Sequence, residues 1–248
     1  MNAQSFYCYL ADELYRLADE WILSKNYQLL YDRLSKIETE RCPVSLTNAL
    51  VFEGERCSGK DTIIDRISQV NASCIPMPRL SDNAAWQRLC SMKKNCYFAV
   101  DDYIVGNLLW FSDLSHRLSQ WLKVNSTQTI LINRYIDSLV IIQNSLLRYE
   151  QKAITSKAHI LAMLDKMFPR PPLTFVLNID LSTLLSRMNN SRNRTLSECE
   201  IAIAHDNILA FRNLSTKGHI HIDACMPIDI VANTVLEYIC ANERRVSN

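Results

Sequence analysis

The sequence predicts an α/β fold, with a parallel sheet of about five strands, helices on both faces and a helical N-terminal extension over residues 1–46. Two observations lead to this prediction. From residue 47 onward, short apolar segments alternate with segments of helical periodicity, which is typical of βαβ units. Before residue 47 the periodicity is helical only. With 248 residues, the chain is long enough for one large domain or two small ones.

Residues 4–40 are expected to form a helical hairpin. One face of its first helix carries apolar residues at three- and four-residue steps: Phe6, Leu10, Leu14, Leu17 and Trp21. A second helix is expected at about 27–37, and Pro43 stops the pattern. The hairpin is expected to pack on the main domain. The alternative is an interaction surface for a partner or for a second subunit, as in a homodimer.

From residue 47 the expected elements alternate. Strands are expected at 49–54, 72–78, 128–133, 173–180 and 219–224. Helices are expected from about Lys60, and at roughly 83–94, 98–123, 137–167, 181–189, 197–214 and 228–241. Helices between successive strands favour a parallel sheet that is covered on both faces.

The composition excludes several classes of protein. The chain is 48% hydrophobic and 21% charged with a net charge of +1, so neither nucleic acid nor a membrane is expected as the main partner. No apolar run reaches the roughly 18 residues of a spanning helix. The N-terminus lacks the pattern of a signal peptide, so we expect a cytoplasmic location. The nine cysteines include no C-x-x-C pair, which favours reduced thiols over a zinc site.

The most specific motif is GERCSGK at residues 54–60, which fits G-x-x-x-x-G-K and contains two of the four glycines in the chain. A loop of this kind points backbone N–H groups at phosphate oxygens, and the following helix N-terminus adds partial positive charge. A chance turn is the alternative, but the strand–loop–helix setting favours a nucleotide site. The expected ATP contacts are Gly54, Glu55, Arg56, Cys57, Ser58, Gly59, Lys60, Asp61 and Thr62.

Several segments resemble the thymidylate kinase family of P-loop nucleoside monophosphate kinases, in the order of that family. They are ALVFEGERCSGKDT, NLLWFSDLSHRLSQWL, ILINRYIDS, PPLTFVLNIDLSTLLSRM, SRMNNSRNRT and IHIDACMPIDIVANTVLEYI. The resemblance covers about residues 47–241 and implies a P-loop NTPase-type domain over 47–248. It also implies transfer of the γ-phosphoryl of ATP, with Mg²⁺, to a nucleoside monophosphate such as dTMP. Catalysis of this kind is mainly positioning and charge neutralisation.

The resemblance also implies roles for single residues. Lys60 would hold the donor phosphates, Arg134 the acceptor phosphate, and Arg192 would be a catalytic arginine of the lid. Arg187 and Arg194 are further lid candidates. The implied acceptor-binding residues are Arg79, Trp110, Arg134 and Tyr135, with Trp110 stacking on the base. Placement in the core is the alternative for Trp110.

Four positions depart from the family pattern. Asp61 replaces the Ser or Thr that meets Mg²⁺, and Asn133 replaces the acid of Asp-Arg-Tyr. Arg56 stands where the loop of this family has an acid, and Leu114 where an arginine reads the base. These changes indicate another acceptor base, a rewired metal site with Asp61 as ligand, or lost catalysis. Two hypotheses follow: a nucleotide kinase, and a degenerate kinase fold that binds nucleotide or a partner without efficient transfer.

Overall fold

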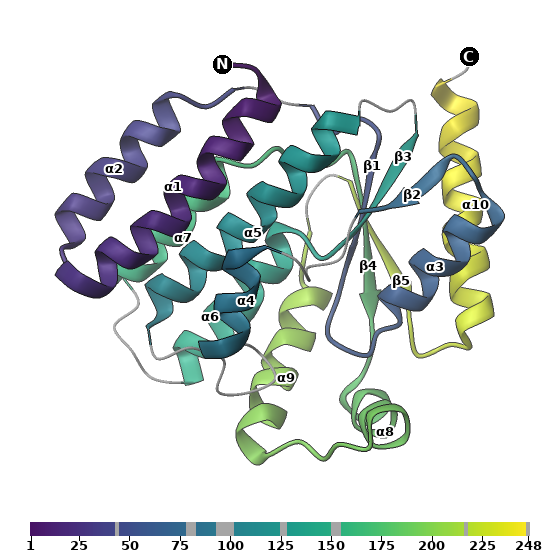
Figure 1. Cartoon of the computed structure of the whole chain (residues 1–248). Coiled ribbons are helices and arrows are strands. Elements are labelled where there is room, and N and C mark those ends of the chain that lie inside the picture. Colours follow the sequence, from purple (N-terminus) through teal and green to yellow (C-terminus); the bar gives the residue numbers. More distant parts are fainter. Residues whose placement is uncertain are drawn as a thin grey trace. The chain divides into compact units, whose positions relative to one another are not determined.

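The computed structural model describes residues 1–42, 45–77, 83–92, 102–124, 128–149, 155–215 and 218–246 (Figure 1). Its helices are α1 (Ala3–Ser24), α2 (Tyr27–Thr39), α3 (Lys60–Val70), α4 (Ala84–Met92), α5 (Tyr103–Val124), α6 (Ile136–Tyr149), α7 (Thr155–Lys166), α8 (Leu181–Arg192), α9 (Glu198–Arg212) and α10 (Ile228–Val246). Its strands are β1 (Ala49–Glu53), β2 (Cys74–Pro76), β3 (Thr129–Asn133), β4 (Leu173–Asn178) and β5 (His219–Asp223).

The five strands form one parallel sheet in the order β2-β3-β1-β4-β5. The central strands β1, β3 and β4 are buried along most of their length, as expected for a sheet covered on both faces. In Figure 1, α3 and α10 lie on one side of this sheet and α9 lies on the other. The predicted fold class is therefore confirmed, and each of the five expected strands is present.

The chain consists of two compact units. The helical unit comprises Met1–Leu46, Met77–Ser126 and Leu139–Arg170, and the sheet unit comprises Thr47–Pro76, Thr127–Ser138 and Pro171–Asn248. The N-terminal residues thus share a unit with later helices. The boundary between an N-terminal extension and a domain over 47–248 stays a prediction. None of the helices in the described ranges is long and apolar enough to cross a membrane.

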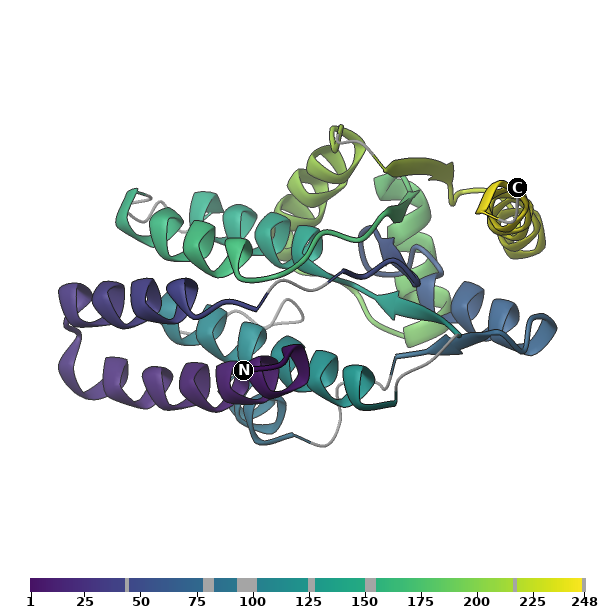
Figure 2. The same ribbon diagram turned by 90° about the horizontal axis from the view of Figure 1, so that it is seen from above.

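In the helical unit, the first helix of the chain packs along α5. Figure 2 shows α1 and α2 as neighbouring antiparallel helices, with α5 beside α1. Phe6, Leu10 and Leu14 are fully buried, and the hydroxyl of Ser112 on α5 donates to the carbonyl of Ala11 at 2.7 Å. The predicted apolar face of the first helix is therefore confirmed as a packing face. Because this face is buried inside the helical unit, it is not free to bind a second subunit.

Asp102 links the N-terminal hairpin to the start of α5. Its Oδ1 accepts hydrogen bonds from the backbone N–H groups of Ile104 at 2.9 Å and Val105 at 3.3 Å, which caps the helix. Its Oδ2 accepts from the indole N–H of Trp21 at 2.8 Å and pairs with the ammonium of Lys25. Although burial opposes it, these partners lower the pKa of Asp102. One carboxylate therefore serves both a helix cap and a hairpin contact.

We expect Asp102→Ala to lower the free energy of unfolding by about 1–2 kcal/mol, because the cap and the Trp21 bond are lost together. Asp102→Asn keeps an oxygen that can cap the helix, so it should cost less than half as much. Chemical denaturation measures both values. Asp12→Ala, an exposed aspartate on α1, is the matched control and should stay within about 0.5 kcal/mol of wild type. Equal stability of Asp102→Ala and wild type would contradict the linking role.

Candidate functional site

The candidate site lies at the carboxyl edge of the sheet, within the sheet unit. The 54–59 loop joins β1 to α3, and Arg134 directly follows β3. These two strands are neighbours, with Phe52 paired to Asn133. The backbone N–H of Arg134 donates to the carbonyl of Phe52 at 3.0 Å. In open parallel sheets ligands bind beyond the carboxyl ends of the strands, so this edge is the expected place for a binding site.

The backbone of the 54–59 loop requires both of its glycines. Gly54 has a φ of 133°, and a Cβ there would lie 2.5 Å from the carbonyl oxygen of Leu177. Gly59 has a φ of 91° and precedes the first turn of α3 without any side-chain cap. Cys57 adopts the left-handed region with a φ of 58°, which costs energy for a residue other than glycine. The first N–H groups of α3 are thus left for an anion.

Lys60 turns back into the loop. Its ammonium donates to the carbonyls of Gly54 at 2.9 Å and Glu55 at 2.7 Å, and to the hydroxyl of Ser58 at 2.9 Å. The residue is 5% exposed, and burial lowers the pKa of Lys60 well below its usual range. The positive charge of the Arg134 guanidinium lowers this pKa further. A phosphate group would relieve the repulsion between the two cations.

Asp61 and Asn133 are hydrogen-bonded to each other. The amide of Asn133 donates to Oδ1 of Asp61 at 2.6 Å. The Oδ1 atom of Asn133 is buried and has no hydrogen-bond partner among the described residues. A carboxylate beside an unpartnered amide oxygen is a fitting donor set for Mg²⁺, which prefers oxygen ligands. The two departures from the family pattern at these positions are therefore one local change. The family pattern has the acid at the position of Asn133, whereas this chain has it at Asp61, and the two positions are in contact.

Glu53 lies at the end of β1 and is fully buried. Its Oε1 accepts from the backbone N–H groups of Tyr135 at 2.9 Å and Ser138 at 3.2 Å, and its Oε2 accepts from the Ser138 hydroxyl. Burial raises the pKa of Glu53 to about 7, and the nearby carboxylate of Asp137 adds to the rise. Arg134 has a strained φ of 64°, and its Nη1 donates to the Ser138 hydroxyl at 3.2 Å.

The raised pKa of Glu53 predicts a pH dependence of stability. The folded protein holds a proton on Glu53 between its ordinary pKa of 4.5 and the folded value of about 7, whereas the unfolded chain does not. The free energy of unfolding should therefore fall as pH rises through this window, by an amount on the order of 3 kcal/mol. Denaturation of wild type and Glu53→Gln from pH 4.5 to 8 tests this.

In this series the stability of Glu53→Gln relative to wild type should rise with pH across the window. Glu237→Gln, an exposed glutamate on α10, is the control and should follow the wild-type curve. Parallel curves for wild type and Glu53→Gln would mean that Glu53 is ionised throughout.

Two neighbouring side chains of the loop, Glu55 and Arg56, carry opposite charges and pair with each other. Glu55 accepts from the backbone N–H of Arg56 at 2.7 Å and from its Nε at 3.3 Å. The guanidinium of Arg56 thus forms an ion pair with the carboxylate of Glu55. Asp61 accepts the hydrogen bond from Asn133 that is described above. Thr62 lies in the first turn of α3 and is exposed.

The lid candidates lie in different settings. Arg187 on α8 donates to the carbonyl of Cys57 at 2.9 Å and to that of Ala224 at 2.8 Å, so it contacts the 54–59 loop directly. Arg194 pairs with Glu200 of α9 at 2.9 Å. Arg192 ends α8, and its side chain lies outside the described part of the chain. Of the two lid arginines whose side chains the structure describes, Arg187 is the one that contacts the loop.

The expected acceptor residues fall into both units. Tyr135 is buried in the sheet unit, where its backbone N–H binds Glu53. Trp110 on α5, in the helical unit, is 5% exposed, and its ring meets Trp86 edge-on at 5.7 Å between centroids. Leu114 is buried one turn further along. Arg79 lies outside the described residues.

A buried ion pair on the same helix has one member on each side of Leu114 in the sequence. The Nε of Arg117 donates to Asp113 at 3.1 Å, and the amide of Asn83 donates to the other oxygen of Asp113. Burial raises the pKa of Asp113, while the guanidinium of Arg117 opposes that rise. An arginine is thus present on α5, three residues after the position where the family pattern has one.

Sequence reasoning missed Glu53 and Ser138. The sequence did carry a signal for Glu53, because this glutamate directly follows the apolar run ALVF of an expected buried strand, and glutamate is rarely buried without a partner. Ser138 carried no signal of its own. On β5, His219 contacts Asp137 at 3.1 Å, and His221 contacts the carbonyl of Leu214 at 2.7 Å.

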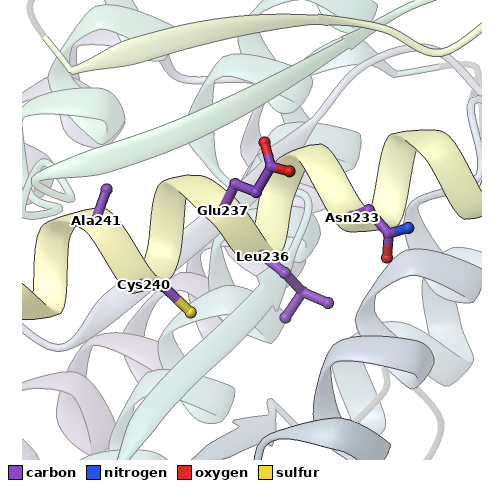
Figure 3. Close-up of a pocket in the computed structure, with 5 residues that line it drawn as sticks. All are labelled: Asn233, Leu236, Glu237, Cys240 and Ala241. Atoms are coloured by element: carbon purple, nitrogen blue, oxygen red, sulfur yellow. The ribbon is translucent and has the colours of Figure 1, made fainter.

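A pocket lies elsewhere in the sheet unit, along α10. It has a volume of about 490 Å³ and is lined by Asn233, Leu236, Glu237, Cys240 and Ala241. In Figure 3, Leu236 and Cys240 point to one side of the helix and Glu237 to the other. All five residues belong to one helix, and none is a predicted site residue. Within the described residues, no group of three or more His, Cys, Asp or Glu could hold a metal ion.

Comparison with known proteins identifies the fold. No protein-family model matches the sequence, and no curated protein matches it. Among solved structures, thymidylate kinase from Candida albicans, described as having broad substrate specificity and a novel structural element, matches with a TM-score of 0.59. The two sequences are 18% identical, and the alignment covers 79% of this chain and 92% of that chain. The chain therefore has the fold of a thymidylate kinase, with a strongly diverged sequence.

Proposed function

We propose that a chain with this nucleotide kinase fold transfers the γ-phosphoryl group of ATP to a nucleoside monophosphate similar to dTMP. The observation that carries the proposal is that Lys60 and Arg134 follow two neighbouring strands, β1 and β3, at the same edge of the sheet, and that Arg134 lowers the pKa of the buried Lys60. This effect on the pKa reflects a repulsion between two cations, which costs energy. A polyanion shared between donor and acceptor phosphates would offset that cost, which fits phosphoryl transfer.

The roles of the residues follow from their positions. The amides of the 54–59 loop and the Lys60 ammonium hold the β- and γ-phosphates of the donor, and Arg134 holds the acceptor phosphate. Both cations stand where charge spreads over the oxygens of the transferring group, so they stabilise the transition state more than either ground state. Asp61 and the amide oxygen of Asn133 would hold Mg²⁺, which supplies charge neutralisation between the phosphates when bound.

The second candidate is a degenerate kinase fold that binds nucleotide or a protein partner without efficient transfer. The burial of Trp110 favours this alternative, because a side chain that is only 5% exposed offers little surface for stacking on a base. The replacement of the base-reading arginine by the buried Leu114 points the same way. Retention of both glycines, Lys60 and Arg134 favours the enzyme, since a binding scaffold for a protein needs none of them.

An assay of phosphoryl transfer decides between the two candidates. ATP, Mg²⁺ and the protein are incubated with a panel of ribo- and deoxynucleoside monophosphates, and the diphosphate products are measured. The proposal expects transfer to at least one pyrimidine deoxynucleotide, with dTMP among the better acceptors. Binding of ATP without transfer to any member of the panel would favour the degenerate fold.

A further inference from the structure

We propose that Glu53 is a positioning residue for Arg134, and that it acts through the hydroxyl of Ser138. The inference rests on the proposed function, in which Arg134 holds the phosphate of the acceptor nucleotide. Glu53 does not itself reach the phosphates in this scheme. It fixes the helix turn that in turn fixes the arginine.

The contacts form a chain with three members. The buried carboxylate of Glu53 binds two backbone N–H groups, of Tyr135 at 2.9 Å and of Ser138 at 3.2 Å, and also the Ser138 hydroxyl. These bonds tie the start of α6 to the end of β1. The same Ser138 oxygen then accepts from Nη1 of Arg134 at 3.2 Å. The hydroxyl has one proton, which goes to Glu53, and its lone pairs remain for the guanidinium.

Arg134 needs such a support for two reasons. Its backbone is held at a φ of 64°, a strained conformation that persists only where neighbouring contacts enforce it. Its side chain is long, and the conformational entropy lost by ordering a mobile arginine on binding would lower the affinity for a phosphate. A guanidinium that is already held through Ser138 keeps its other N–H groups oriented before the ligand arrives.

The test variant is Ser138→Ala. It removes the hydroxyl but leaves both backbone N–H bonds of Glu53 in place, so the fold should survive. Calorimetry with dTMP as probe should show about a tenfold weaker binding, and the KM for dTMP should rise in step. Affinity for ATP should stay within about twofold of wild type. Ser138→Thr retains a hydroxyl and should restore the binding of dTMP.

Two further variants sharpen the result. Ser145→Ala is the matched control: Ser145 is a buried serine on the same helix whose hydroxyl accepts from Arg148 at 3.1 Å. It should leave dTMP binding unchanged. Glu53→Gln should weaken dTMP binding at least as much as Ser138→Ala does, because a carboxamide has only one oxygen and its NH2 group cannot accept from the Ser138 hydroxyl.

The outcomes separate this inference from the proposed function. Unchanged dTMP binding by Ser138→Ala would overturn the positioning role, as would an equal loss for dTMP and ATP together with a lower melting temperature. If wild type binds dTMP but transfers nothing, the proposed enzyme fails, while the comparison of dTMP binding still decides the role of Glu53. If wild type binds no dTMP, both the acceptor role of Arg134 and the inference are overturned.

Discussion

Lys60→Ala is expected to weaken ATP binding by about ten- to a hundredfold, the loss that corresponds to one charge-assisted contact of about 1.5–3 kcal/mol. The ammonium is buried, and it now holds two loop carbonyls and the hydroxyl of Ser58. Removing it would take away the proposed phosphate contact, together with the three hydrogen bonds that hold the 54–59 loop. Isothermal titration calorimetry with ATP and Mg²⁺ measures the loss.

Two companion variants make the Lys60 experiment specific. Lys60→Met keeps the aliphatic stem that fills the buried space, so a similar loss there would identify the charge as the cause. Lys36→Ala, an exposed lysine on α2, should leave ATP affinity unchanged. A folded Lys60→Ala protein that binds ATP as tightly as wild type would end the interpretation of this loop as a phosphate site.

The second large effect is expected at Asp61 and Asn133. Asp61→Asn should lower Mg²⁺-dependent nucleotide binding and turnover by about ten- to a hundredfold, because the carboxylate next to the unpartnered amide oxygen is lost. Asn133→Asp should be deleterious as well, since two carboxylates would face each other across a contact of 2.6 Å. Neither single change leaves the site with one carboxylate and one neutral partner.

The double variant is the informative member of this series. Asp61→Ser combined with Asn133→Asp puts the acid back on the strand side of the contact, as in the thymidylate kinase pattern. It should restore Mg²⁺-dependent activity to within about threefold of wild type, which gives a strong coupling between the two sites. Additive losses in the double variant would show that the two positions act independently, and would remove the account of Asp61 as a metal ligand.

The fold could be predicted because its signals are local. The buried strands are short apolar runs, and the helices between them have a clear period, so their order followed from the sequence alone. The boundaries were less accurate. One helix was expected at 137–167, but the structure has α6 (Ile136–Tyr149) and α7 (Thr155–Lys166), and residues 150–154 lie outside the described residues.

The site was harder to predict because its contacts join distant segments. The bond between Asp61 and Asn133 spans 72 residues and depends on β3 lying beside β1, which no periodicity reveals. As single positions, both residues look like lost function; as a pair they retain one carboxylate. Trp110 shows the opposite case. The sequence matches the stacking aromatic of the family in residue type alone. The low exposure of the Trp110 side chain, 5%, depends on how α5 packs, which the residue type does not show.

The most direct test of the central claim follows a labelled phosphate. Wild-type protein is incubated with γ-labelled ATP, with dTMP or in parallel with each of the other nucleoside monophosphates, and with either Mg²⁺ or a chelator, and the nucleotides are separated. The proposed kinase predicts labelled dTDP with Mg²⁺, none with the chelator, and strongly reduced label with Lys60→Ala. If ATP binds but no label reaches dTMP or any other nucleoside monophosphate with Mg²⁺ present, the chain is not a nucleotide kinase, and its phosphate loop serves binding alone.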